Sequence, residues 1–540
     1  MTDTEASTSP AAGRRATRHR RSGLLLLAVF AGILLVQAAW AIVVPPFRGL
    51  DEHDHAYRAD SVAHGDWNQQ HEASPQGWGS FVRVDADLVE QARPICETFP
   101  YTTRDNCVGG GEAGDGRVRV ASSAAQYNPA FYWVVGTAAR PFSGATELYA
   151  MRLAAASLCA LLLTIAVATI RVWARSSWPL VGLAAAVTPT MLYSTSLVAP
   201  NGVEMCAAAV VWCALLGVAR CAGDRRMMGR LLTIATVAAF PLVTVRALGP
   251  LWMVLIVVTC AVLVRAATLR DLGRQRGTWI RVGLVGTAAV LGGLWSLTAG
   301  TNDFSPDGHY DDPMWQVLPK NLVLWVAQSV GAFPARDEMA PLALYAIALI
   351  LWWLVLFAAV RAAGRRERAA LGLAVLLSAA VPCVITALTY ASIGPVWQGR
   401  YGYPLAMGVW LISGYALDRK PALLAGFPAL RTGRRPLVMV ILTIGVTQLI
   451  GQFGVLVPQV RKSPLADSDA WIAHPAWLVV LLTCLGTLLL ARVGAGRSGQ
   501  RDEWATQRSS VARAAPESTA SRAFAMPSAS ASSTPPGPAA

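Results

Sequence analysis

The chain has 540 residues, of which 54% are hydrophobic and 14% are charged. Soluble domains average about 25% charged residues. Apolar runs long enough to cross about 30 Å of hydrocarbon recur along most of the length. Backbone groups inside a bilayer must pair within their own segment, so these runs are predicted to be helices. Composition therefore excludes a soluble enzyme and predicts an all-α, polytopic integral membrane protein.

Twelve membrane spans are predicted in chain order, although Pro241 interrupts one of them and the segment from 401 is short. They cover residues 23–44, 147–170, 177–198, 203–220, 229–245, 249–267, 279–299, 341–360, 369–390, 401–417, 436–457 and 473–492. A basic arm, 1–22, precedes the membrane domain, 23–493. The tail, 494–540, is rich in Ser, Ala, Pro and Arg, a composition that predicts a disordered cytoplasmic segment.

Orientation follows from the basic residues, which fall in the N-terminal arm and in alternate connections. These connections hold Arg171 and Arg175; Arg220, Arg225, Arg226 and Arg230; Arg270, Arg274 and Arg276; Arg361, Arg365, Arg366 and Arg368; and Arg419, Lys420, Arg431, Arg434 and Arg435. We therefore predict a multi-pass plasma-membrane protein with both termini in the cytoplasm. The net charge of +14 is a topology signal, because no nucleic-acid-binding module accompanies the scattered arginines.

The first span also has a basic start and the small-x-small pattern Ala39-Trp40-Ala41 of a signal cleavage site. Its apolar run is long for a signal core, so an uncleaved anchor is favoured.

Two outer loops, 45–146 and 300–340, hold 19 of the 32 acidic residues. The first begins with PPFRGLDEHDHAYRAD, residues 45–60, directly after the first span. Adjacent acids raise one another's pKa, so one of these carboxylates is a candidate catalytic group. The cluster can also hold a divalent cation, which would be coordinated by oxygens of Asp51, Glu52 or Asp54 and by an imidazole of His53 or His55. The simpler alternative is a solvated polar linker.

Two further features of the first outer loop have structural interpretations. Cys96 and Cys107 are the only cysteines in an outer loop, so an oxidised pair is predicted there. The aromatic segment 127–142 is too short to span comfortably and suits a surface-lying helix that ends at Arg140. A thirteenth span here would break the alternation of basic loops.

Arginines and acids at the predicted outer ends of spans are candidate binding residues. Arg152, Arg246 and Arg400 can converge on a lipid phosphate, or simply extend to ordinary headgroups. Glu204 is either functional or a charge at a helix N-terminus. The segment ending in Asp337 either folds back over Asp51 or is a polar stop before the next span.

The order of these motifs resembles a family of predicted bacterial membrane proteins, domain of unknown function 2142. The family pattern is matched by Pro45-Pro46-Phe47 with Asp51-Glu52, His55 and Tyr57-Arg58-Ala59; by Tyr127-Asn128-Pro129; by Pro200-Asn201; by Gly331, Phe333, Asp337 and Pro341; and by Gln398 to Tyr401 with Pro404. Asn201 replaces the commoner Asp of its turn, which removes a carboxylate, and Pro334-Ala335-Arg336-Asp337 replaces a Gly-Trp-Leu-Asp motif.

That family is similar to membrane glycosyltransferases of the GT-C type, which have a large first outer loop with short surface helices. The resemblance implies transfer of a sugar from a polyprenyl-phosphate donor to an extracytoplasmic glycan or lipid acceptor, in cell-envelope glycan synthesis. Asp51 would be the general base, with Glu52 and His55 beside it. Substrate binding would fall to Tyr57, Arg58, Arg246, Asp337, Gln398, Arg400 and Tyr401.

Two other classes stay open. A transporter or flippase for lipid-linked glycans needs ionisable residues within its spans, and these span interiors are nearly free of charge. The third class is a non-catalytic assembly partner for lipid-linked glycans.

Overall fold

The computed structural model describes residues 10–67, 72–75, 79–110, 116–299, 310–333, 338–419, 430, 432–472 and 476–496, with the backbone alone before residue 22. The chain divides into two units, Met1–Ala495 and Gly496–Ala540, and the architecture below is that of the first.

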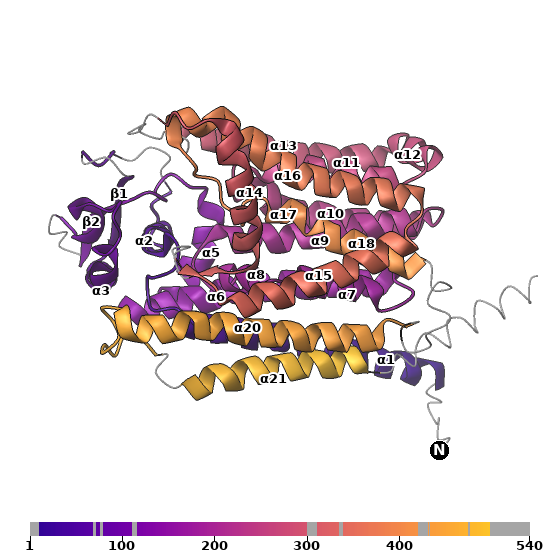
Figure 1. Ribbon diagram of the computed structural model, residues 1–540, viewed down its shortest axis with the longest axis horizontal. Coiled ribbons are helices and arrows are strands. Elements are labelled where there is room, and N and C mark those ends of the chain that lie inside the picture. The colour runs from indigo at the N-terminus through magenta and orange to yellow at the C-terminus, as the bar shows by residue number, and fades with distance from the viewer. Residues whose placement is uncertain are drawn as a thin grey trace, which may run out of the picture. The chain divides into compact units, whose positions relative to one another are not determined.

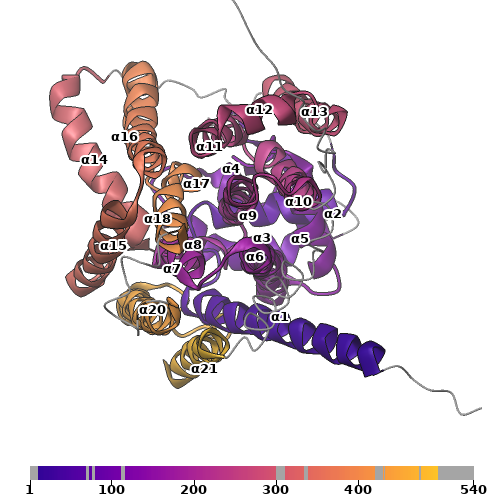
Figure 2. The same cartoon turned by 90° about the vertical axis from the view of Figure 1, so that its right-hand side faces the viewer.

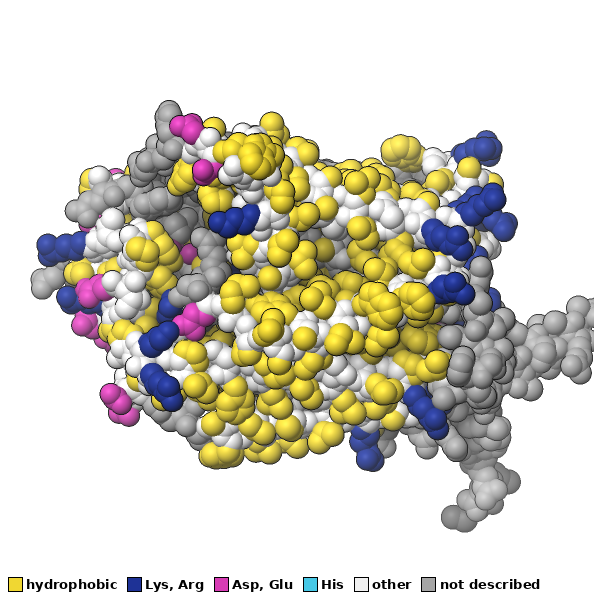
Figure 3. All heavy atoms as spheres, viewed as in Figure 1, with side chains coloured by type: hydrophobic (Ala, Val, Ile, Leu, Met, Phe, Trp, Pro, Cys, Tyr) yellow, Lys and Arg dark blue, Asp and Glu magenta, His cyan; other side chains and the backbone are white. Residues whose placement is uncertain are grey.

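Nine helices in the described ranges are long and apolar enough to cross a membrane. They are α1 (Pro10–Val43, apolar from Ser22), α6 (Gly144–Trp173), α9 (Pro200–Arg220), α10 (Arg225–Thr244), α13 (Arg276–Thr298), α15 (Leu342–Ala362), α16 (Arg365–Ile393), α20 (Arg434–Lys462) and α21 (Ala476–Ala495). They run roughly along one direction (Figure 1), and apolar side chains cover the visible surface between two ends that carry charge (Figure 3). This is a helical, multi-pass membrane protein.

The other three predicted spans are shorter or broken. They form α7 (Trp178–Ala186) with α8 (Pro189–Ser194), α11 (Gly249–Leu263), and α17 (Tyr403–Ala406) with α18 (Gly408–Arg419). The prediction of twelve comparable spans is therefore only partly right. Breaks in the helical hydrogen bonding are tolerated where protein surrounds them, and nearly every residue of α18 is buried.

Helices in the centre of the bundle pack so closely that some positions have room only for glycine. Helix α9 lies among the other helices when they are viewed end-on (Figure 2), and most of it is buried. Gly182 on α7 faces α18, where a Cβ would lie 2.4 Å from the Trp410 carbonyl oxygen. Glycine is therefore required for these two short helices to meet.

The second outer loop contains a helix that the sequence did not predict, α14 (Met314–Val330). It crosses the direction of the long helices (Figure 1). Trp315 and Val323 are exposed on it, and Lys320 and Pro319 interrupt its apolar run. The strands β3 (Ala332–Phe333) and β4 (Glu338–Met339) follow, while α12 (Ala266–Gly273) lies at the opposite end of the bundle.

The first outer loop folds into a small lobe of helices and two antiparallel strands. It contains α2 (Glu52–Ala63), β1 (Ser80–Asp85), α3 (Ala86–Cys96), α4 (Arg104–Cys107), β2 (Arg117–Ser122) and α5 (Pro129–Ala139). Ser80 pairs with Ser122 at one end of the β1–β2 ladder. Helix α5 is the predicted surface helix. It packs against α2 at Gly136, where a Cβ would lie 2.1 Å from the Ala59 carbonyl oxygen.

The predicted basic connections meet at the end of the bundle opposite this lobe. The Asp418 carboxylate accepts hydrogen bonds from the backbone N–H groups of Arg175 and Ser176 and lies 3.6 Å from Arg220. Arg419 pairs with Glu367 at 2.8 Å. Connections far apart in the sequence thus share one end, as alternation of the basic loops predicts.

A buried ion pair joins the first span to the lobe. The Arg152 guanidinium on α6 donates to both oxygens of Glu52, at 2.8 and 2.6 Å. It also donates to the carbonyl oxygens of Ala41, Val44 and Pro45, at 2.7 to 2.9 Å. The last carbonyls of a helix have no partner within it and carry partial negative charge. Arg152 therefore closes the end of α1 and fixes where α2 begins.

Cysteine labelling tests the orientation. We expect Glu90→Cys, on the exposed side of α3, to react with an impermeant maleimide in intact cells. Arg225→Cys, which is exposed at the basic end, should react only after permeabilisation. The reverse pattern would invert the topology, and the unsubstituted chain gives the background from its native thiols.

Intact-mass analysis tests the Cys96–Cys107 bond, which the structure contains with a Cα–Cα distance of 5.5 Å. Alkylation before reduction should leave this pair unmodified. Replacing both residues by Ser should lower the free energy of unfolding by about 3 kcal/mol, because closing a short loop restricts the unfolded chain. Free alkylation of both thiols in unreduced protein would refute the bond.

Removing one partner of the Arg152–Glu52 ion pair should lower the stability of the fold strongly. Arg152→Met leaves the Glu52 carboxylate buried and unpaired, so we expect a loss of about 3–5 kcal/mol of stability. Thermal unfolding in detergent measures it. Arg171→Met, on the same helix and without an ion pair in the described part of the chain, is the control. A midpoint for Arg152→Met equal to that of the control would contradict the clamp.

Candidate active site

Helix α2 is polar in sequence yet almost wholly buried. Its charged and polar side chains bind a different segment each. Asp54 accepts hydrogen bonds from the N–H and hydroxyl of Ser123, and His55 is hydrogen-bonded to the Tyr132 hydroxyl. Arg58 donates to the carbonyl oxygens of Asp66 and Tyr127. Asp60 forms an ion pair with Arg117. The helix therefore organises the lobe, and most of the predicted reactive cluster is engaged in internal bonds. It is not a solvated linker.

Glu52, His55, Tyr57 and Arg58 are inaccessible in this arrangement. Glu52 and Arg58 are fully buried, and Glu52 also accepts hydrogen bonds from the N–H groups of Gly49 and Val198. Burial is the main cause that lowers the pKa of His55 to about 3; Asp51 opposes this shift, and Arg246 and Arg400 contribute to it. His55 is therefore neutral at ordinary pH. The sequence grouped these residues with Asp51 as site residues. Glu52 and Arg58 bind other segments, whereas the charges of Asp51, Arg246 and Arg400 act on the buried His55 imidazole.

The three proposed metal ligands also diverge. Glu52 pairs with Arg152, Asp54 binds Ser123, and Asp51 faces another direction, toward Tyr101 and Arg400. Within the described ranges, no group of three or more His, Cys, Asp or Glu side chains is arranged to hold a metal ion.

Asp51 is the exception in this cluster, because its side chain remains one-third exposed. Its backbone is left-handed, with φ 54° and ψ 22°, a conformation that costs a non-glycine residue of order 1–3 kcal/mol. Asp at a helix N-cap normally accepts a hydrogen bond from the helix backbone, but Asp51 makes no such bond. Its carboxylate instead accepts from the Tyr101 hydroxyl at 3.3 Å. The strained position thus presents a carboxylate that α2 does not use.

Two arginines and a tyrosine complete the accessible part of the site. An oxygen of Asp51 lies 3.8 Å from a terminal nitrogen of Arg400, a loose ion pair. The Nε of Arg400 is buried without a hydrogen-bond partner. The guanidinium carbons of Arg246 and Arg400 lie 4.8 and 5.3 Å from the centre of the Tyr401 ring. Both cations therefore gather on one ring beside the partly exposed Asp51 carboxylate.

The segment between α16 and α17 carries Arg400 and Tyr401, and glycines shape it. Gly394 has φ 67°, in the left-handed region that favours glycine. A Cβ at Gly399 would lie 2.0 Å from the Trp325 carbonyl oxygen. The Gly399 N–H donates to the Gln328 side chain, at 2.9 Å. This segment is therefore packed tightly on α14, and the arginine extends from a fixed backbone.

The remaining predicted site residues have different outcomes. Gln398 is buried next to this segment, and Asp337 lies outside the described residues. Arg152 does not join Arg246 and Arg400, because it is fully buried and bound to Glu52 and α1. The suggestion that all three converge on a lipid phosphate is wrong for Arg152. Arg246 instead lies 3.6 Å from Glu204 at the start of α9.

Sequence reasoning missed Tyr101, Trp252 and Trp397. Tyr101 reaches Asp51 from the middle of the disulfide-closed loop. Trp397 packs edge-on against Trp252, with ring centroids 6.3 Å apart, and against Tyr401, at 5.9 Å. Only the position of Trp397 beside the Gln398–Tyr401 motif gave a sequence signal.

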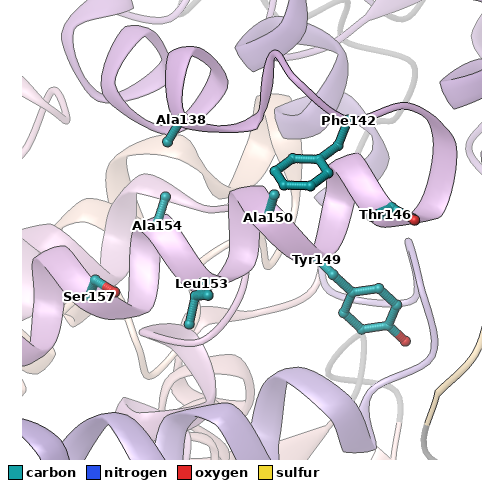
Figure 4. Close-up of a pocket in the computed structure, with 8 residues that line it drawn as sticks. All are labelled: Ala138, Phe142, Thr146, Tyr149, Ala150, Leu153, Ala154 and Ser157. Carbon is teal, nitrogen blue, oxygen red and sulfur yellow. The ribbon is translucent and has the colours of Figure 1, made fainter.

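An apolar groove of about 410 Å³ lies elsewhere, along α6 and the end of α5. It is lined by Ala138, Phe142, Thr146, Tyr149, Ala150, Leu153, Ala154 and Ser157 (Figure 4). None of these residues belongs to the Asp51–Arg400 cluster.

Comparisons with known proteins give one family and one kind of solved structure. A comparison with curated proteins found no match. Two similar solved structures are those of ArnT from Cupriavidus metallidurans. The apo form is 16% identical with a TM-score of 0.39, covering 90% of this chain and 80% of that one. The form bound to undecaprenyl phosphate is 15% identical with a TM-score of 0.40, covering 89% and 80%.

The family model for predicted membrane proteins called DUF2142 matches residues 34–409, a range that includes Asp51, Arg246, Arg400 and Tyr401. The chain belongs to the DUF2142 family of predicted membrane proteins.

Proposed function

We propose that the protein is a membrane glycosyltransferase of the GT-C type that uses a polyprenyl-phosphate-linked sugar. The observation that carries the proposal is the position of Asp51. Its backbone is strained, its carboxylate is partly exposed and unused by its own helix, and two arginines share the Tyr401 ring beside it. A general base, Asp51, next to two arginines that can bind an anion suits the transfer of a sugar from a phosphate leaving group.

The proposed reaction inverts the configuration of a sugar carbon. An acceptor hydroxyl gives its proton to the Asp51 carboxylate while its oxygen bonds to the anomeric carbon. The bond from that carbon to the phosphate oxygen breaks, and the polyprenyl phosphate leaves with the bonding electron pair. A general base must lie within hydrogen-bond reach of the proton that it takes, and the exposed edge of Asp51 allows an acceptor to approach.

Arg400 is the residue that we assign to the leaving phosphate. Its Nε has no partner, and its contact with Asp51 is long. A guanidinium offers five donors in a fixed plane, a geometry that fits phosphate oxygens. Stabilisation is most effective where charge develops in the transition state, which here is the phosphate. Arg246, paired with Glu204, adds positive potential from the other side of Tyr401.

Glu52, Arg152 and His55 become positioning residues in this proposal. Glu52 and Arg152 anchor the first turn of α2, and His55 holds the neighbouring turn on Tyr132. Glu52 and Arg152 bind each other and the end of α1, while the buried His55 imidazole interacts with the Asp51 charge. The buried charge also favours an enzyme over a transporter, because Glu52, Arg152, Glu204 and Arg246 gather at the lobe end of the bundle and not along a path through it.

Replacing Asp51 tests the base. Asp51→Asn keeps size and hydrogen bonding but cannot accept a proton at ordinary pH, so transfer should fall by about 100-fold or more. The assay is the formation of glycosylated acceptor in membranes from cells that express each variant. Asp87→Asn, exposed on α3 in the same lobe, is the control.

Expression and thermal stability of Asp51→Asn should match the wild type. Wild-type transfer with Asp51→Asn would remove the proposed base, whereas loss of transfer in the control would show that the assay reports the fold of the lobe.

Replacing Arg400 tests phosphate binding. Arg400→Ala should weaken binding of polyprenyl phosphate in detergent about tenfold or more, because charge-assisted bonds in a dry site are strong. Arg400→Lys should recover only part, since an ammonium lacks the planar fork. Arg140→Ala, exposed at the end of α5, is the matched surface arginine. Equal binding by the Arg400 and Arg140 variants would make Arg400 an ordinary headgroup contact.

A further inference from the structure

Five polar atoms next to the arginines are buried without hydrogen-bond partners. They are both side-chain polar atoms of Asn201, Oε1 of Glu204, and the indole nitrogens of Trp252 and Trp397. Their side chains are at most 7% exposed. Leaving a buried polar group unpaired destabilises the fold, so such groups are rare unless a ligand or water satisfies them.

These groups form one cluster although they come from three parts of the chain. Asn201 and Glu204 are three residues apart in the first turns of α9, so they share one face of that helix. Glu204 lies 3.6 Å from Arg246 and also interacts with the Trp252 indole, which makes no hydrogen bond of normal geometry. Trp252 packs on Trp397, and Trp397 packs on Tyr401.

The cluster is continuous with the accessible site. Arg246 joins it to Tyr401 by lying over that ring and beside Glu204. Arg400 lies over the same ring and reaches Asp51. A molecule whose phosphate contacts Arg400 and Arg246 therefore has the unpaired groups of Asn201, Glu204 and Trp252 next to it.

We infer that this cluster, Asn201, Glu204, Trp252 and Trp397, binds the sugar of the donor and selects a neutral sugar with free hydroxyl groups. The inference rests on the proposed function and names the substrate class at that site. Hydroxyls both donate and accept, which matches an amide, a carboxylate oxygen and two indole N–H donors. The indole rings supply the apolar faces that sugar rings stack against.

Charge decides between kinds of sugar. Arg246 already faces Glu204, and Arg400 is assigned to the phosphate, so neither arginine is left for a second anion. A uronic acid would place its carboxylate beside Glu204, and like charges at short range repel. A neutral pentose or hexose avoids this repulsion.

Binding of matched lipids tests the inference. The probes are polyprenyl phosphate alone and the same lipid phosphate carrying a neutral pentose, a neutral hexose or a uronic acid. We expect at least one neutral sugar to bind roughly tenfold more tightly than the bare lipid phosphate, and the uronic acid to give no gain. Asn201→Leu and Trp252→Phe should each remove most of the gain while leaving the affinity for bare polyprenyl phosphate unchanged.

The thermal stability of the ligand-free protein shows whether the Trp252 indole N–H makes a hydrogen bond that stabilises the fold. Trp252→Phe removes an N–H that makes no hydrogen bond of normal geometry, so the thermal midpoint should change little or rise. Trp173→Phe is the matched control, because its indole donates to the Cys213 carbonyl oxygen at 3.0 Å and lies at the other end of α9. Its midpoint should fall.

The outcomes distinguish this inference from the proposed function. If no neutral sugar binds more tightly than bare lipid phosphate, or if the gain survives both Asn201→Leu and Trp252→Phe, the cluster binds water alone and the inference is overturned. Binding of the bare lipid phosphate would still depend on Arg400 in that case. Loss of the Arg400 dependence itself would instead overturn the proposed function.

Discussion

The site depends on one buried ion pair. Arg152 binds three carbonyl oxygens at the end of α1 and both oxygens of Glu52 at the start of α2, so a single guanidinium sets the distance between the first span and the lobe. A buried ion pair contributes little net stability compared with apolar packing, but it fixes geometry because either partner alone is costly. The turn between the two helices has little freedom, and Asp51 is held left-handed in it.

Helix α2 shows how burial separates structural groups from reactive ones. Its acids, histidine and arginine each bind a different segment of the lobe, and these bonds add to the apolar core that its strands and helices bury. Asp51 has no such bond to its own helix and keeps an exposed edge. The surrounding contacts offset the free-energy cost of its left-handed backbone, and such strained residues are common at functional sites.

Hydropathy predicted the long spans, because a run of apolar residues without charge is sufficient to specify a membrane helix. It failed at α7 with α8 and at α17 with α18, where Pro189 and Gly408 lie in segments that the surrounding helices bury. It also missed α14, whose apolar residues alternate with Lys320 and polar positions. The strands β1 and β2 are paired over a long intervening sequence, and no local pattern specifies that pairing.

The candidate site was predictable as a region but not residue by residue. The motifs around Asp51 and Arg400 indicated two segments, and the structure brings them within 3.8 Å. The resemblance named Asp51 as the base, but the sequence did not reveal that Glu52 is buried in an ion pair, since its partner lies 100 residues away on α6. Asn201 looked like a lost carboxylate, whereas its amide is one of the buried groups without a partner.

The most direct test of the central claim, that Asp51 and Arg400 form one reaction centre, is an electron cryo-microscopy structure of the protein with bound polyprenyl phosphate. The account predicts the phosphate in contact with Arg400, beside Tyr401 and the exposed edge of Asp51, with the Arg152–Glu52 pair unchanged. A phosphate bound at the α5–α6 groove or at the basic end of the bundle, with the Asp51–Arg400 region empty, would contradict it.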